Sequence, residues 1–89
     1  MKIVVTVVGH DRVGIIAMVS KILAENKVNI LNINQNIVEE YFNMVLIGDM
    51  SGSIIELSKL QDILKKKGME IGLQIKAQHE DIFRNMHRI

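Results

Sequence analysis

Two glycines enclose a polar segment that follows the first apolar run of the chain. Residues 9–14 read Gly-His-Asp-Arg-Val-Gly, a glycine spacing shared with phosphate-binding loops, which continue with Lys and then Ser or Thr. Here Ile15 and Ile16 follow instead, and the carboxylate of Asp11 would repel a phosphate. Nucleotide binding is therefore disfavoured. Two interpretations remain: a turn that simply needs glycine, or backbone N–H groups opened by Gly14 that receive a small carboxylate ligand, whose ammonium group Asp11 would face.

The histidines do not predict a metal site or a catalytic site. His79 and His87 fall on one predicted helix and lie about 12 Å apart along its axis, too far to share an ion. His10 is remote from both in the sequence and has no nucleophile or second acid beside it. The absence of cysteine excludes disulfides and thiolate chemistry. We therefore expect no catalytic residue, no metal and no cofactor.

The elements that hold the glycine-bounded segment follow from hydrophobic periodicity. The β-branched residues 2–8 predict a strand, and the apolar spacing of residues 13–25 predicts a helix, with Asp11 as its N-cap. Residues 28–38 and 41–49 predict a hairpin with Glu39-Glu40 in its turn. Residues 32, 34 and 36 of the first hairpin strand are all asparagine, which indicates either the solvated face of an edge strand or a polar row at a ligand or subunit contact.

The second half of the chain adds a helix, a strand and a terminal helix. We predict a helix over residues 54–67, with Ser53 and Glu56 as a capping box and Gly68 as its stop. Clean alternation over residues 69–77 predicts a strand with one solvated face, and residues 78–89 predict a short helix.

The predicted order βαββαβ is that of the α+β ferredoxin-like fold. It implies an antiparallel four-stranded sheet with two helices on one face, and places the first and third strands at its centre. Those strands are apolar on both faces, so the second face of the sheet needs a cover, for which the terminal helix is the candidate through Ile82, Phe83 and Met86. We expect one domain over residues 1–89, with a core over 1–77 and a helical extension over 78–89.

Composition limits the classes of partner. The 89 residues carry a formal net charge of +1, which does not favour electrostatic nucleic-acid binding. RNA-recognition domains share this topology but stack bases on aromatic residues of the central strands, whereas Tyr41 and Phe42 are neighbours that point to opposite faces. No apolar run is long enough to cross a membrane. We expect a cytoplasmic protein with no nucleic-acid or membrane partner.

The segment GHDRVGIIAMVSKILAENKVNILNI, residues 9–33, resembles the signature half of an ACT domain, a small ligand-sensing module of amino-acid metabolic enzymes. The shared features are the Asp-Arg-x-Gly-Ile loop after the first strand, the amphipathic helix and Asn-Ile at the entry to the second strand. The whole chain, with the NINQNI…YFNMVLIGDM hairpin, is similar to the small stand-alone ACT-domain proteins. Val13 stands where many members have proline, and Asp11 where amino-acid-binding members often have asparagine.

The resemblance implies a non-catalytic regulatory module that binds a small metabolite, an amino acid in particular, at the interface of a homodimer and acts on a regulated enzyme. It implies that Asp11 hydrogen-bonds the ligand, that Gly14 lets the ligand approach the backbone, and that Asn29 contacts it across the interface. The expected ligand-binding residues are Asp11, Arg12, Val13, Gly14, Ile15, Asn29 and Asn32. The alternative is a protein–protein adaptor in which the loop is purely structural.

Overall fold

The computed structural model describes residues 1–86. Its elements, in chain order, are β1 (Lys2–His10), α1 (Ile15–Glu25), β2 (Asn29–Val38), β3 (Tyr41–Asp49), α2 (Leu57–Ile71), β4 (Leu73–His79) and α3 (Glu80–Met86). The strands form one antiparallel sheet in the order β2-β3-β1-β4. The predicted ferredoxin-like fold is confirmed. Residues 87–89, the predicted end of the terminal helix, lie outside the described residues.

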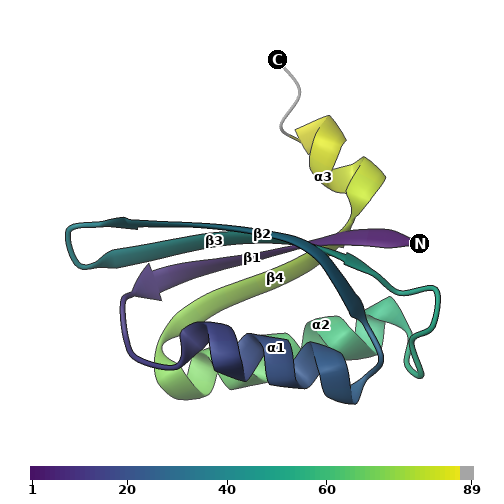
Figure 1. The fold of residues 1–89 in the computed structure, drawn as a ribbon, viewed down its shortest axis with the longest axis horizontal. Helices are drawn as coiled ribbons and strands as arrows, with labels where there is room; N and C mark the ends of the chain where they lie inside the picture. The colour runs from purple at the N-terminus through teal and green to yellow at the C-terminus, as the bar shows by residue number, and fades with distance from the viewer. Residues whose placement is uncertain (87–89) are drawn as a thin grey trace.

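The molecule has two layers, with α1 and α2 side by side against one face of the sheet (Figure 1). Alternation along the strands decides which side chains lie between the layers. In β1, Ile3, Val5 and Val7 point toward the helices and are fully buried, whereas Val8 points to the other face and is 44% exposed. The apolar sequences of residues 3–8 and 41–47 belong to the two central strands, as predicted.

The edge strand β2 presents its asparagine row on the face away from the helices. Asn32 and Asn34 are opposite Ile47 and Val45 of β3, and both are exposed. The register shifts between Ile30 and Asn32, so a bulge interrupts the strand near its start. The asparagine row therefore lies on the solvated face of an edge strand, although this does not test whether it contacts a ligand.

The prediction that Asp11 caps the first helix was wrong. The helix begins at Ile15, and its N-cap is Gly14, with φ of 90° and no side-chain cap hydrogen bond. Because β1 continues to His10, the residues from Asp11 to Gly14 are needed to turn the chain. A left-handed backbone completes that turn, which glycine adopts without steric cost.

The predicted ends of the second helix were also wrong. The Ser53 hydroxyl donates to the carbonyls of Asn26 and Ile55 and accepts the N–H of Ile55, so it forms no capping box with Glu56. Gly68 lies inside α2, and the left-handed Gly72 ends the helix with φ of 75°. In consequence residues 69–71 are helical and β4 runs over residues 73–79 rather than 69–77.

The terminal helix leaves most of the open face of the sheet uncovered: Val4, near the start of β1, is 3% exposed, but Val8 is 44% exposed. The helix contacts β1 and β4 and points away from the sheet (Figure 1), and Ile82 is 54% exposed. Val45, in the middle of the open face, remains 40% exposed. The chain turns into α3 directly after the edge strand β4, at the end where β1 begins, so seven residues cannot reach back across the face.

Candidate functional site

The β1–α1 loop, residues 11–14, leaves the first turn of α1 open to a ligand. The first intrahelical hydrogen bond runs from the N–H of Met18 to the carbonyl of Gly14, so the N–H groups of residues 15–17 have no acceptor within the helix. A Cβ atom built on Gly14 would have nothing within 4 Å. Together, the open backbone and the positive end of the helix dipole favour a carboxylate at this position.

Two contacts with distant parts of the chain fix the loop. The N–H of Asp11 donates to the carbonyl of Glu40 in the β2–β3 turn at 2.8 Å. The guanidinium of Arg12 donates to the carbonyl of Ile71, the last residue of α2, at 3.4 Å. The loop is therefore tied on one side to the hairpin and on the other to the end of the second helix.

A small hollow lies on each side of the loop. One, of about 180 Å³, is lined by Asp11, Gly14, Ile15 and residues of β2 that include Gln35. The other, of about 210 Å³, is lined by Arg12, Val13, Gly14, Ile15 and residues of α2. Small-molecule pockets usually begin at about 300 Å³, so neither hollow is a complete ligand site within one chain.

The structure brings the predicted loop residues together but leaves the two predicted asparagines elsewhere. Asn29 pairs with Asp49, and Asp49 also pairs with Lys2, so Asn29 lies level with the start of β1. The loop, in contrast, follows His10 at the end of β1. Eight residue steps of a strand separate these ends by about 27 Å. Asn29 and Asn32 line neither loop hollow, so one chain does not unite the predicted set.

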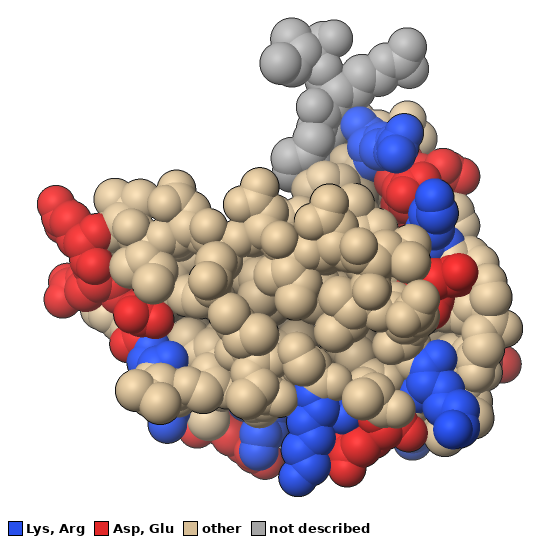
Figure 2. All heavy atoms as spheres, in the orientation of Figure 1, with Lys and Arg blue, Asp and Glu red and all other residues tan. Residues whose placement is uncertain are grey.

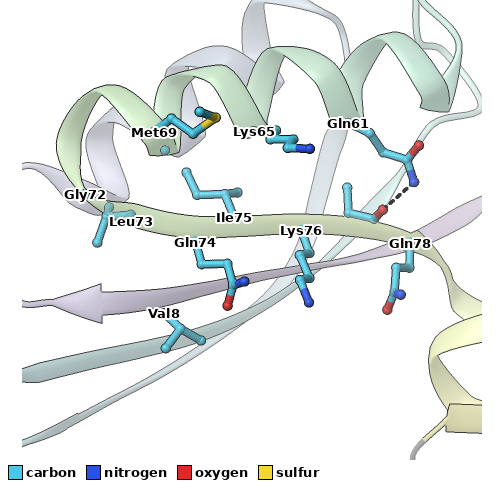
Figure 3. Close-up of a pocket in the computed structure, with 12 residues that line it drawn as sticks. Val8, Gln61, Lys65, Met69, Gly72, Leu73, Gln74, Ile75, Lys76 and Gln78 are labelled. Atoms are coloured by element: carbon cyan, nitrogen blue, oxygen red, sulfur yellow. Dashed lines mark hydrogen bonds between the residues drawn. The ribbon is translucent and has the colours of Figure 1, made fainter.

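A larger hollow, which the sequence did not predict, lies at the opposite edge of the sheet from β2. It has a volume of about 690 Å³ and lies along the edge strand β4 and the outer side of α2 (Figure 3). None of the predicted site residues lines it. Lys65 and Lys76 are the charged residues of its lining. The sequence does not show that they lie near each other, because their distance depends on how α2 packs against β4.

His10 and His79 each contact a neighbouring residue of the fold, and His87 lies outside the described residues. The His10 ring packs against the Tyr41 ring, with centroids 4.9 Å apart. The Nδ1 atom of His79 accepts the N–H of Asp81 at 3.1 Å, at the start of α3. Within residues 1–86, no three His, Cys, Asp or Glu side chains gather as ligands for a metal ion.

The side of the molecule formed by β2 and α1 is uncharged at its centre. Residues 28–38 contain no charged residue, and Leu31, Ile33, Ile37 and Val38 are exposed. In Figure 2 this side appears as a broad tan surface with charged side chains at its rim. An edge strand with an exposed apolar surface and no charge is suited to pairing with another chain.

No helix among residues 1–86 has the length and apolar character needed to cross a bilayer.

The order and pairing of its elements define a ferredoxin-like domain, and comparison with known proteins identifies its family. The family model for the ACT domain matches residues 1–78. The chain belongs to the ACT-domain family.

Relatives of the same length support the assignment. A UPF0237 protein of Clostridium perfringens is 53% identical and one of Clostridium acetobutylicum is 49% identical, each over the full length of both chains. An ACT domain protein of Streptococcus pneumoniae superimposes with a TM-score of 0.81 at 35% identity, covering 93% of each chain. The regulatory subunit of aspartate kinase from Thermus thermophilus shares the fold, with a TM-score of 0.66 at 20% identity over 86% of this chain and 50% of that one.

Proposed function

We propose that this protein is a non-catalytic regulatory module of the cytoplasm that binds a small amino acid at the interface of a homodimer and thereby controls an enzyme. The observation that carries the proposal is the open β1–α1 loop, where the left-handed Gly14 leaves unpaired N–H groups facing a hollow. These N–H groups suit the ligand's carboxylate, and the exposed carboxylate of Asp11 suits its ammonium group.

A homodimer would bring the start of the partner's β2 to the loop, from which the same chain's Asn29 and Asn32 are distant. If β2 pairs with β2 of a second copy about a two-fold axis through the middle of the strand, the first residues of one strand lie opposite the last residues of the other. Val38, at the end of β2, pairs with Tyr41 and adjoins the turn that holds Asp11. The first residues of the partner subunit's β2, from Asn29 to Asn32, would then lie beside the end of β2 that adjoins the loop, with the Asn32 side chain on the open face of the sheet.

Thermal-shift titration with each of the proteinogenic amino acids tests the ligand. A ligand at 100 times its Kd stabilises the folded state by about 2.7 kcal/mol, which raises the Tm of a domain of this size by about 10 °C or more. Asp11→Ala and Asn29→Ala should abolish the shift. The matched controls Asp62→Ala in α2 and Asn85→Ala in α3 change the same residue types away from the loop and should keep it. The absence of a shift with every amino acid would contradict the amino-acid assignment.

Sedimentation velocity tests the dimer. Ile33 lies near the middle of β2, so Ile33→Lys would place two positive charges close together across the proposed two-fold axis, and the protein should sediment as a monomer. Ile54→Lys adds the same charge at an exposed position outside the sheet and should leave the dimer intact. A wild-type protein that sediments as a monomer at all concentrations would refute the interface.

A further inference from the structure

The groove along β4 is a second place where the fold exposes backbone to a partner. In the sheet order β2-β3-β1-β4, strand β4 has a neighbouring strand on one side only. Its Ala77 carbonyl points outward, because it accepts the side-chain amide of Gln61 from α2 at 2.7 Å. Main-chain groups of alternate residues in an antiparallel strand point to the same side, so the N–H and carbonyl of Ile75 also face outward.

The groove extends around this edge onto both faces of the sheet. Figure 3 shows Lys65 and Met69 of α2 on the helix side of β4, and Gln74 and Lys76 on the opposite side. A strand added beside β4 would direct its alternate side chains toward these two groups in turn. The exposed Met69 side chain and the buried Ile75 supply apolar surface on the helix side.

The charge of the side chains along the β4 groove indicates which kind of segment it binds. Among residues 1–86, the ionisable side chains that line the groove are Lys65 and Lys76, one on each side of the strand edge, and no carboxylate of these residues lines it. A second copy of β4 would bring these lysines toward those of the first copy, and like charges opposed across strands are destabilising. An acidic strand would meet both lysines with opposite charge.

We infer that the β4 edge, between α2 and the open face of the sheet, binds an extended acidic segment of another protein by strand addition. The segment pairs with the outward main-chain groups of Ile75 and places carboxylates against Lys65 on one face and Lys76 on the other. Because this surface is separate from the β1–α1 loop and from β2, the inference does not depend on the amino-acid site or on the dimer.

Peptide binding to the full-length protein, followed by amide NMR shifts and fluorescence anisotropy, tests the inference. The probe is an eight-residue peptide of valine, threonine and glutamate, with glutamates on both faces of the extended chain. It should shift the amides of residues 73–79. A peptide with glutamine in place of every glutamate should bind more weakly, and an acidic peptide N-methylated at alternate main-chain nitrogens should lose binding because it cannot complete the strand ladder.

Charge reversal supplies the decisive comparison. Loss of one exposed ion pair weakens binding about two- to five-fold, so the Lys65→Glu and Lys76→Glu double variant should bind the acidic peptide about ten-fold or more weakly. The same variant should bind a peptide with lysine in place of glutamate, which the wild type should not. Lys59→Glu makes an equal charge change on α2 outside the groove and should have little effect.

Several results would overturn the inference. These are equal binding of the acidic and neutral peptides, equal weakening by Lys59→Glu, and full binding of the N-methylated peptide. Shifts at β4 that inorganic phosphate reproduces would identify a general anion site instead. Shifts at β4 that follow protein concentration without peptide would identify a second copy as the occupant.

Discussion

Replacing Gly68 by alanine tests how closely α2 packs on β4. Glycine inside a helix is less favourable than alanine by about 1 kcal/mol, so helix propensity alone predicts that Gly68→Ala stabilises the protein. The structure predicts the opposite. A Cβ atom at this position would lie 2.5 Å from the carbonyl oxygen of Leu73 and 3.2 Å from a side-chain carbon of Ile75. The Leu73 oxygen is main chain, so no rotamer change relieves the contact.

The expected size follows from these opposing effects. Overpacking a tight contact costs about 1–3 kcal/mol, and the upper part of that range applies because the helix itself must shift. After the gain in helix propensity is subtracted, Gly68→Ala should lower the free energy of unfolding by about 1–2 kcal/mol. Each kcal/mol corresponds to about 4–8 °C in Tm for a domain of this size.

Gly52→Ala is the matched control. Its Cβ would have only the Lys27 carbonyl within reach, at 3.9 Å, and its φ is not in the left-handed region. The same substitution there should leave stability unchanged or raise it by about 0.4–1 kcal/mol, because alanine restricts the unfolded chain. Urea unfolding followed by circular dichroism at one fixed protein concentration measures both variants. A Gly68→Ala protein as stable as the wild type would refute the close packing of α2 on β4.

Three further predictions concern the core, the loop and one carboxylate. Leu64→Ala removes a fully buried side chain of α2 and should lower the free energy of unfolding by about 2–5 kcal/mol in urea denaturation; a loss below about 1 kcal/mol would show that the core is not packed as described. Gly14→Ala imposes a left-handed backbone on an alanine at φ of 90° and should destabilise by about 1–2 kcal/mol in the same assay, whereas Gly14→Asn, which tolerates that backbone better, should lose less. The hydroxyl and N–H of Ser51 donate to the Asp49 carboxylate and hold its pKa below the ordinary value. The resulting stabilisation is present above the unfolded pKa of the carboxyl group and lost as pH falls through the lower folded pKa; carboxyl NMR titration should show the pKa rising in Ser51→Ala, and an unchanged pKa would contradict the role of Ser51.

Several features of the fold were predictable because they depend on local pattern. The run of β-branched residues over 2–8 identifies β1 as a central strand, and the acidic pair Glu39-Glu40 marks the hairpin turn. The loop with Gly14 was also predictable, because its glycine and the following apolar helix are adjacent in the chain. In each case the residues that determine the structure lie within a few positions of one another.

The errors arose where two local solutions were equally good and a distant contact decided between them. Gly68 and Gly72 both fit the end of a helix after a lysine run. The Leu73 carbonyl, which lies against Gly68, makes the first a packing residue and leaves the second as the cap. Asp11 fits an N-cap as well as Gly14 does until β1 is seen to pair as far as His10.

The sequence by itself determined the order of strands and helices, the identity of the central strands and the loop with its open glycine, since periodicity and glycine positions encode them locally. Only the tertiary structure decided that Asn29 lies about 27 Å from the loop along the sheet and that Lys65 and Lys76 line the same groove from opposite sides of β4. The physical reason is that both relations depend on the register of paired strands and on the distance between a helix and a sheet, which long-range packing sets.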